Sequence, residues 1–224
     1  MNQTAAYFDV DETLTHDVTL FSFLRHDAHT TGQTEQAETF LRELAARRAQ
    51  GEPRESTNRY YYQWWKGRDV QKICDLAGNW WAGRLQKPDL FLRSDVLARY
   101  EWHSRQGHAR ILLSGSFVQL IEPLAAALDV TRVIATVPLT GQGRFTGEIG
   151  EPLIGDAKRT ALLADARDHG IDLTTSHGYG DHRSDLPFLS VLGHPHLVTP
   201  PGKGWQDPDF PITIWPPTAD MHPA

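Results

Sequence analysis

Two acidic side chains, Asp9 and Asp11, follow a short apolar segment near the start of the chain. The segment from Ala5 to Asp9 predicts a buried strand, and residues two apart on a strand point to the same face. Open α/β sheets bind ligands beyond the carboxyl ends of their strands, where this pair would lie. Two neighbouring carboxylates are unfavourable unless a cation, a shared proton or reaction chemistry stabilises them. A lone D-x-D motif is more often a solvated acidic turn, so the other segments decide whether Asp9 and Asp11 belong to a functional site.

Three further segments place polar residues suited to phosphate at a predicted strand end or helix start. Ser114 and Gly115 end a buried strand and precede an apolar-periodic helix, whose N-terminal amides would favour an anion. Lys158 lies near the start of another predicted helix. Asp181 and Asp185 follow a glycine-rich strand end. Taken alone, Ser114 would be a helix cap and Lys158 a solvated helix residue.

The predicted elements alternate between strands and helices, as in a largely parallel sheet covered by helices on both faces. Residues from about 20 to 100 interrupt this alternation with a mostly helical block. We therefore expect an α/β fold, with a three-layer α/β/α Rossmann-like core and a mostly parallel sheet. Residues 1–16 and 101–224 would form this core, and residues 17–100 an inserted α-helical cap. The turn-rich segment from Gly141 to Gly147 predicts a small hairpin.

The composition is that of an ordinary globular protein, with 40% hydrophobic and 22% charged residues among 224. A net charge of −6 argues against a nucleic-acid partner, and no apolar run is long enough for a membrane span. The single Cys74 excludes an internal disulfide framework. Because the first residues lack the pattern of a secretory signal, we expect a cytoplasmic protein. Nothing in the sequence assigns an oligomeric state.

The four segments, taken in order, resemble the haloacid dehalogenase superfamily, in particular its phosphoserine-phosphatase-like branch, subfamily IB. The resemblance extends from Ala5 to about Pro200. It includes the hairpin sequence Gly143-Arg144-Phe145-Thr146-Gly147 and a Gly-Asp-x-x-x-Asp-Leu-Pro segment that begins at Gly180. Each motif alone is weak. All of them together, with a helical insertion after the first, are highly specific.

The resemblance implies a Mg²⁺-dependent phosphatase that hydrolyses a small-molecule phosphomonoester through an aspartyl-phosphate. Asp9 would be the nucleophile. Asp11 would protonate the leaving group and then activate water. The carboxylates of Asp9 and Asp181, with the backbone carbonyl of Asp11, would hold Mg²⁺, a hard cation that prefers oxygen ligands. Asp185 would support the metal site and orient Lys158.

The same resemblance assigns the phosphate contacts. Ser114, the amide of Gly115 and Lys158 would bind the phosphoryl oxygens, and Thr13 would support the loop or the phosphate by hydrogen bonding. Phosphoryl transfer depends mainly on positioning and charge stabilisation, which such groups provide.

The cap would recognise the leaving group. Phosphoserine phosphatases carry a glutamate nine residues after the nucleophile, where this chain has Val18. That departure counts against phosphoserine, although Asp17 would serve with a one-residue shift. The aromatic side chains of residues 60–85 either line a pocket for an apolar, aromatic or quaternary-ammonium group or fill the core of the cap. The candidates for the pocket are Trp64, Trp65 and Trp81. Four basic side chains either meet a second anionic group or are solvated: Arg54, Arg59, Lys66 and Arg68.

Two other functions remain open. A phosphotransferase would use the same aspartyl-phosphate and pass the phosphoryl group to an alcohol, and a non-catalytic binding protein would keep only the fold. The eleven histidines form no H-E-x-x-H pattern, so the sequence does not predict catalytic zinc. The chain has no G-x-x-x-x-G-K-[ST] loop and no complete dinucleotide fingerprint, which argues against ATP and nicotinamide chemistry.

Overall fold

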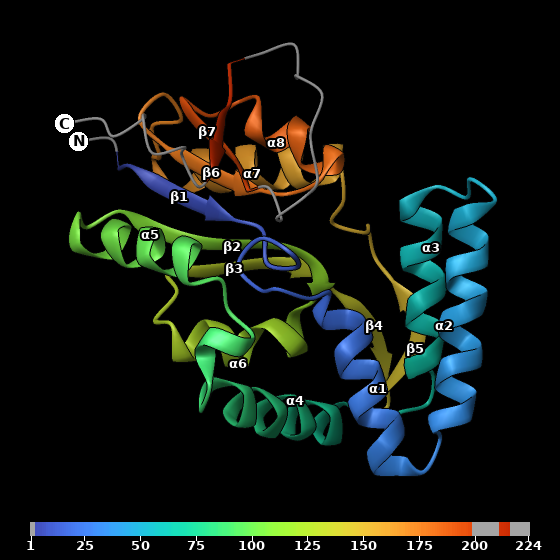
Figure 1. Ribbon diagram of the computed structural model, residues 1–224. Coiled ribbons are helices and arrows are strands. Elements are labelled where there is room, and N and C mark those ends of the chain that lie inside the picture. Colours follow the sequence, from blue (N-terminus) through green and yellow to red (C-terminus); the bar gives the residue numbers. More distant parts are fainter. Residues whose placement is uncertain (1–2, 199–210, 216–224) are drawn as a thin grey trace.

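Six parallel strands form the central sheet (Figure 1). The computed structural model describes residues 3–198 and 211–215. In spatial order the strands are β3 (Arg132–Thr136), β2 (Ala109–Phe117), β1 (Ala5–Phe8), β6 (His177–Gly180), β7 (His194–Val198) and β8 (Thr213–Trp215). Because β1 lies between β2 and β6, the residues that follow these three strands meet at one edge of the sheet.

Helices cover both faces of the sheet, because successive side chains of β1 enter different hydrophobic clusters. Tyr7 packs with α7 (Asp156–His169) and α8 (Leu186–Leu189), whereas Phe8 packs with α5 (Ser94–Arg105) and α6 (Val118–Ala127). The predicted α/β/α fold class is confirmed. No helix in the described ranges is both long and apolar enough to cross a membrane.

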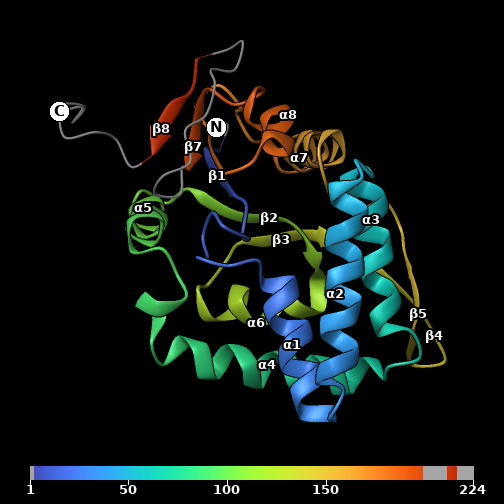
Figure 2. The same cartoon turned by 45° about the vertical axis from the view of Figure 1, so that its right-hand side comes forward.

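A mostly helical segment is inserted between β1 and α5. It contains α1 (Thr19–Thr31), α2 (Thr34–Ala49), α3 (Arg54–Tyr61), η1 (Tyr62–Trp65), α4 (Val70–Leu85) and η2 (Pro88–Leu90). Figures 1 and 2 show α1, α2 and α3 beside one another near the carboxyl ends of β1 and β2, with α4 alongside α6. We call residues 17–92 the cap segment.

The two connections between the cap segment and the sheet pair with each other. Thr15 and Leu92 form an antiparallel bridge, and the amide of Arg93 donates to the carbonyl of Leu14 over 2.9 Å. The cap boundaries predicted from the sequence, 17 and 100, remain a prediction. The second falls inside α5, where Tyr100 packs on Phe8 of β1 with ring centroids 5.3 Å apart.

The predicted hairpin forms β4 (Pro138–Gly141) and β5 (Arg144–Ile149). Its turn residues Gln142 and Gly143 both have positive φ, as a tight two-residue turn requires. The hairpin contacts the cap segment, since Gly67 donates to the carbonyl of Phe145 over 2.8 Å and Phe145 donates to the carbonyl of Arg68 over 2.9 Å. It therefore joins core and cap at a second place.

Two strand boundaries differ from the sequence predictions. The segment from Val133 to Leu139 predicts one strand from its sequence, but it is divided between two strands, β3 and β4. β2 continues to Phe117, and its pairing with β3 shifts register between Ser114 and Phe117. Ser114 and Gly115 consequently lie in an irregular strand end and not at the start of α6. The proline-rich segment of the predicted core beyond residue 198 lies largely outside the described residues.

Candidate active site

A cavity of about 430 Å³ opens where β1, β2 and β6 end and the cap segment begins. From the core it is lined mainly by Asp9, Asp11, Gly115, Lys158, Asp181 and Asp185. The structure thus brings together six of the residues that the motifs singled out. They come from four segments that are far apart in the sequence. Three of the four segments converge because the parallel strands that precede or carry them end at the same edge of the sheet. The fourth, with Lys158, lies in the first turn of α7.

Lys158 connects two of the carboxylates. Its Nζ donates to Asp9 Oδ1 over 2.8 Å and to Asp185 Oδ1 over 2.7 Å, and all three side chains are buried. Burial alone would lower the pKa of Lys158, but the charges of Asp185 and Asp9 together raise it, so the ammonium stays charged. A Cβ at position 180 would lie 2.7 Å from the Cβ of Asp185, so Gly180 permits this close approach.

Three carboxylates form a cluster suited to a hard cation. One oxygen from each of Asp9, Asp181 and Asp185 lies within 4.8 Å of the others. Burial raises the pKa of Asp9 well above its ordinary value, although Lys158 opposes the rise, and burial together with Asp185 raises the pKa of Asp181 to about 7. Ionised carboxylates this close together repel one another unless a cation lies between them. An all-oxygen set of ligands of this kind fits Mg²⁺.

Asp11 has a different environment from Asp9. Its Oδ1 accepts hydrogen bonds from the backbone amide of Thr19 over 2.7 Å and from the Thr19 hydroxyl over 2.5 Å. Its Oδ2 accepts from Ser116 Oγ over 2.9 Å. Burial raises the pKa of Asp11, and these hydrogen bonds oppose the rise. Asp11 lacks the contact with Lys158 that favours the ionised form of Asp9, so hydrogen bonds from Thr19 and Ser116 influence its protonation instead.

The residues predicted to contact the phosphate have different environments in the structure. Gly115 lines the cavity, whereas Ser114 is fully buried and its Oγ accepts from the amide of Ser116 over 3.1 Å. Thr13 donates to Asp181 Oδ1 over 3.1 Å, so it orients a carboxylate in this structure. The roles of Ser114 and Thr13 toward phosphate remain predictions.

The cap segment supplies a wall of mixed polarity. It contributes Val18, Leu20, Arg48, Glu52, Arg54 and Asn58. Val18 therefore lines the cavity at the position where phosphoserine phosphatases carry a glutamate. Asp17 is not among the lining residues, and its Oδ2 instead accepts from Arg84 over 2.6 Å.

The tryptophans proposed as pocket residues lie elsewhere. Trp65 and Trp81 are fully buried. Trp65 packs against Phe117 with ring centroids 5.5 Å apart. Trp81 Nε1 donates a hydrogen bond of 2.7 Å to the carbonyl of Leu120. Trp64 donates to Asp27 over 3.1 Å. None of the three lines the cavity. Trp64 packs within the cap segment on Phe40, whereas Trp65 and Trp81 pack between the cap segment and the core. All three are therefore packing residues, but only Trp64 fits the predicted filling of the cap alone.

Of the four basic side chains considered for a second anion, only Arg54 reaches the cavity. Arg59 donates to the carbonyls of Ile149 and Gly150, and Arg68 pairs with Asp27. Lys66 is not a lining residue either, and packs beside the glycine of the hairpin at position 147.

Comparison with known proteins identifies the family. Residues 6–190 match the family described as haloacid dehalogenase-like hydrolase. The chain belongs to this family. It is therefore an enzyme of the hydrolase class, and the resemblance predicted from the motifs is confirmed.

Individual relatives agree with this assignment. A Streptomyces azureus protein named for inhibition of morphological differentiation is 26% identical over 223 residues, covering 93% of this chain and 79% of the relative. A probable phosphatase of Mycobacterium tuberculosis is 32% identical over 98 residues, and the match covers 44% of this chain but only 34% of that relative.

Solved structures show the same fold. A Bordetella pertussis Tohama I protein of unknown function has a TM-score of 0.78 and 21% identity, covering 90% of this chain and 93% of its own. A phosphoserine phosphatase studied as a phospho-aspartyl intermediate analogue has a TM-score of 0.64 and 17% identity, with 88% and 87% covered.

The residues of this haloacid dehalogenase-like site that were not predicted include Thr19, Ser116, Arg48 and Asn58. Ser116 lies in the predicted Ser114-Gly115-Ser116 segment, so its place near the site was foreseeable. Its hydrogen bond to Asp11 was not foreseeable from the sequence. The other three belong to the cap segment, whose packing over the strand ends has no local sequence signal.

Proposed function

We propose that this protein is a Mg²⁺-dependent phosphatase that hydrolyses a small-molecule phosphomonoester through an aspartyl-phosphate on Asp9. The observation that carries the proposal is the pairing of a buried, Lys158-bound Asp9 with a separately hydrogen-bonded Asp11 in one cavity. These environments suit one carboxylate that attacks and a second that handles protons.

In the first step, Asp9 Oδ would attack phosphorus while the bond from phosphorus to the leaving oxygen breaks. Protonated Asp11 would give its proton to that oxygen. In the second step, Asp11 would take a proton from water as the water attacks phosphorus, and the bond to Asp9 would break. Inorganic phosphate leaves, and Asp11 is protonated again.

Mg²⁺ would be held by the carboxylates of Asp9 and Asp181 and the backbone carbonyl of Asp11, with Asp185 in support. When bound, it would offset the repulsion between the anionic nucleophile and the phosphate. Lys158 and the backbone at Gly115 would contact the phosphoryl oxygens and keep them in line with Asp9.

The cap wall supports a substrate class. Arg48 and Arg54 line the cavity, and no acidic side chain occupies position 18. These features favour a leaving group that carries an anionic or strongly polar group, and they disfavour phosphoserine.

Replacing Arg48 with Gln should raise KM for esters with a second anion and leave KM for neutral leaving groups unchanged. Arg42→Gln, an exposed change on the same helix, is the matched control.

The decisive experiment is a screen of phosphorylated metabolites with purified protein and Mg²⁺, in which phosphate release is measured. Asp9→Asn should abolish release while preserving the circular dichroism spectrum. Normal turnover by that variant would overturn the nucleophile assignment. Added alcohols test the alternative, because phosphate recovered on the acceptor would identify a phosphotransferase. Absence of turnover over a broad panel would favour a binding protein.

A further inference from the structure

Histidines that are scattered in the sequence gather at the opposite end of the strands from the acidic cluster. His177 is the first residue of β6, whereas Asp181 follows the last residue of that strand. His103 belongs to the last turn of α5, and His108 immediately precedes β2. His196 of β7 stacks on His177 with ring centroids 5.6 Å apart. The proposed phosphatase chemistry uses none of these side chains.

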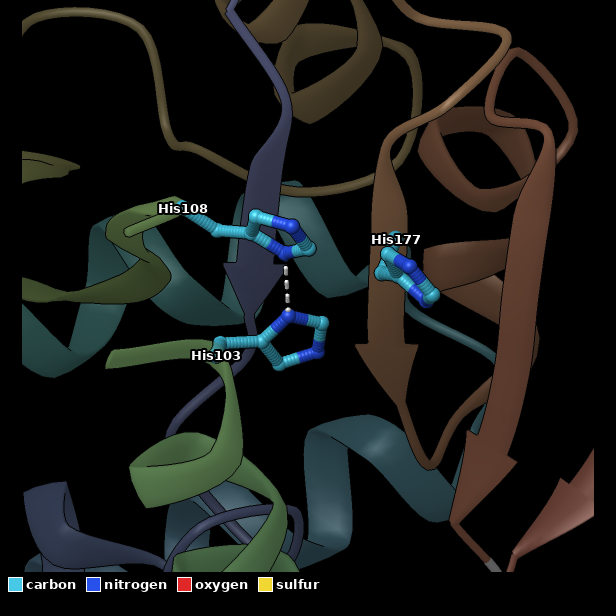
Figure 3. A group of neighbouring side chains, drawn as sticks. All are labelled: His103, His108 and His177. Atoms are coloured by element: carbon cyan, nitrogen blue, oxygen red, sulfur yellow. Dashed lines mark hydrogen bonds between the residues drawn. The ribbon is translucent and has the colours of Figure 1, made fainter. Parts of the chain in front are cut away.

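Three of the rings lie close together, with His103 and His108 facing each other and His177 beside them (Figure 3). One ring nitrogen from each of His103, His108 and His177 lies within 4.8 Å of the other two. His103 Nδ1 and His108 Nδ1 are 2.9 Å apart. Two nitrogens bound to one tetrahedral zinc ion at ~2.05 Å lie about 3.3 Å apart, so small side-chain rotations would complete a three-nitrogen site.

The remaining ring nitrogens of His103 and His177 have partners that would fix those two rings. His103 Nε2 lies 2.9 Å from the hydroxyl of Tyr179, and His177 Nδ1 lies 3.3 Å from Nε2 of His196. Metal-binding histidines commonly use their second nitrogen in this way, because an outer hydrogen bond sets the tautomer and the ring orientation. The arrangement leaves His103 Nδ1, His108 Nδ1 and His177 Nε2 as the coordinating atoms.

The chemistry of the donors selects the ion. His103 and His177 are both buried and lie against other imidazole rings, an environment that favours the neutral form of each ring. Neutral imidazoles bind borderline ions such as Zn²⁺, Ni²⁺ and Cu²⁺ and bind Mg²⁺ poorly. His108 is only half-buried, which gives an ion a route from solvent. The guanidinium of the nearby Arg99 is held by two other contacts, since it donates to Tyr179 over 3.0 Å and stacks on Trp102.

We propose that His103, His108 and His177 form a binding site for one divalent transition-metal ion, with zinc the expected occupant and water as a fourth ligand. The ion would join α5, the residue before β2 and the start of β6. These segments surround the stacked pair Phe8 and Tyr179, whose centroids are 4.5 Å apart. The ion would therefore stabilise the sheet beneath the residues that carry Asp9 and Asp181, without taking part in the reaction.

Cobalt provides the test, because tetrahedral Co²⁺ absorbs visible light much more strongly than octahedral Co²⁺. Metal-stripped protein would be titrated with CoCl₂ under saturating Mg²⁺, and ZnCl₂ would then be added. We expect one Co²⁺ per chain with a tetrahedral spectrum, displaced by Zn²⁺, and a higher Tm in the presence of Zn²⁺.

Variants locate the ion. His108→Gln, at a half-buried side chain, should weaken Co²⁺ binding at least ~10-fold and abolish the Tm increase. His103→Gln is a second variant of the same site. His29→Gln, an exposed change on α1, is the matched control and should bind as the wild type does. Asp181→Asn should also retain the tetrahedral spectrum.

Three results would overturn the site: an octahedral spectrum, equal affinity in His108→Gln and wild type, or loss of the ion in Asp181→Asn. None of them bears on phosphate release. Failure of this site and failure of the proposed phosphatase activity are therefore separate outcomes.

Discussion

The carboxylate of Asp11 accepts a 2.7 Å hydrogen bond from the backbone amide of Thr19, the first residue of α1. A core residue is thereby held by the N-terminal turn of the first cap helix, where backbone amides stabilise negative charge. Ser116 binds the other oxygen from the core side. The position of the cap segment and the protonation of Asp11 are consequently linked.

Removing the Ser116 hydroxyl tests whether these hydrogen bonds set the protonation of Asp11. Ser116→Ala should raise the pKa of Asp11, because the lost hydrogen bond favours the ionised form. Asp11 must be protonated in the first step, so the alkaline limb of the kcat profile should move to higher pH. We expect kcat near neutral pH to fall ~10-fold from poorer orientation. The readout is the pH–rate profile, with the exposed Ser190→Ala as control. An unshifted limb would contradict the role of the Ser116 hydrogen bond in the protonation of Asp11.

Replacing Lys158 should affect both activity and stability. Lys158→Gln removes the cation between Asp9 and Asp185, and we expect kcat/KM to fall at least ~100-fold. It also leaves two buried carboxylates without their partner, which should lower the free energy of unfolding by about 3–5 kcal/mol in urea denaturation. Arg105→Gln, which breaks only an exposed pair with Glu101, should change neither quantity. Wild-type kinetics in Lys158→Gln would exclude the lysine from the site.

Magnesium affinity should depend on pH around neutrality. Burial and the nearby Asp185 raise the pKa of Asp181 to about 7 without metal, so below that pH a proton must leave before the ion binds. The dissociation constant for Mg²⁺ should therefore rise ~10-fold per unit as the pH falls below 7 and level off above it. Calorimetric titration on both sides of neutrality gives this dependence. The same affinity at every pH would show that Asp181 is not a ligand.

Trp81 should prove to be a stability residue. Trp81→Phe removes the hydrogen bond to the carbonyl of Leu120 and replaces a fully buried ring by a smaller one, at a cost of about 1–3 kcal/mol. Because Trp81 does not line the cavity, KM should stay at the wild-type value at temperatures where the variant is folded. The comparison needs a thermal melt and a substrate titration. A changed KM with an unchanged Tm would indicate that Trp81 contacts the substrate.

Sequence patterns locate the core site well because its geometry follows from strand order. Asp9 and Asp181 each follow a strand, and adjacent parallel strands end at the same edge whatever their separation in the chain. The cap is harder to predict. An aromatic block fits a pocket and a packed interior equally well, and only the contacts of Trp65 and Trp81 distinguish them.

The histidine cluster illustrates a second limit. His103 and His177 are 74 positions apart, and no local spacing relates them. Their rings meet because α5 packs across the face that carries Phe8 and Tyr179, with His103 and Tyr179 rings 5.7 Å apart. A motif search for zinc cannot detect a set of ligands that only tertiary packing assembles.

Trapping the phosphorylated enzyme tests the central claim most directly. In Asp11→Asn, residue 11 can neither protonate the leaving group nor activate water. With an aryl phosphate, whose leaving group needs no proton, the first step should still proceed and a phosphoryl group on Asp9 should accumulate. The reaction is quenched in acid, digested and analysed by mass spectrometry. We predict one phosphoryl group on the peptide that contains Asp9, and none in Asp9→Asn with the same substrate. An enzyme that releases phosphate at the wild-type rate after Asp9→Asn, or carries the phosphoryl group on another residue, would contradict the account.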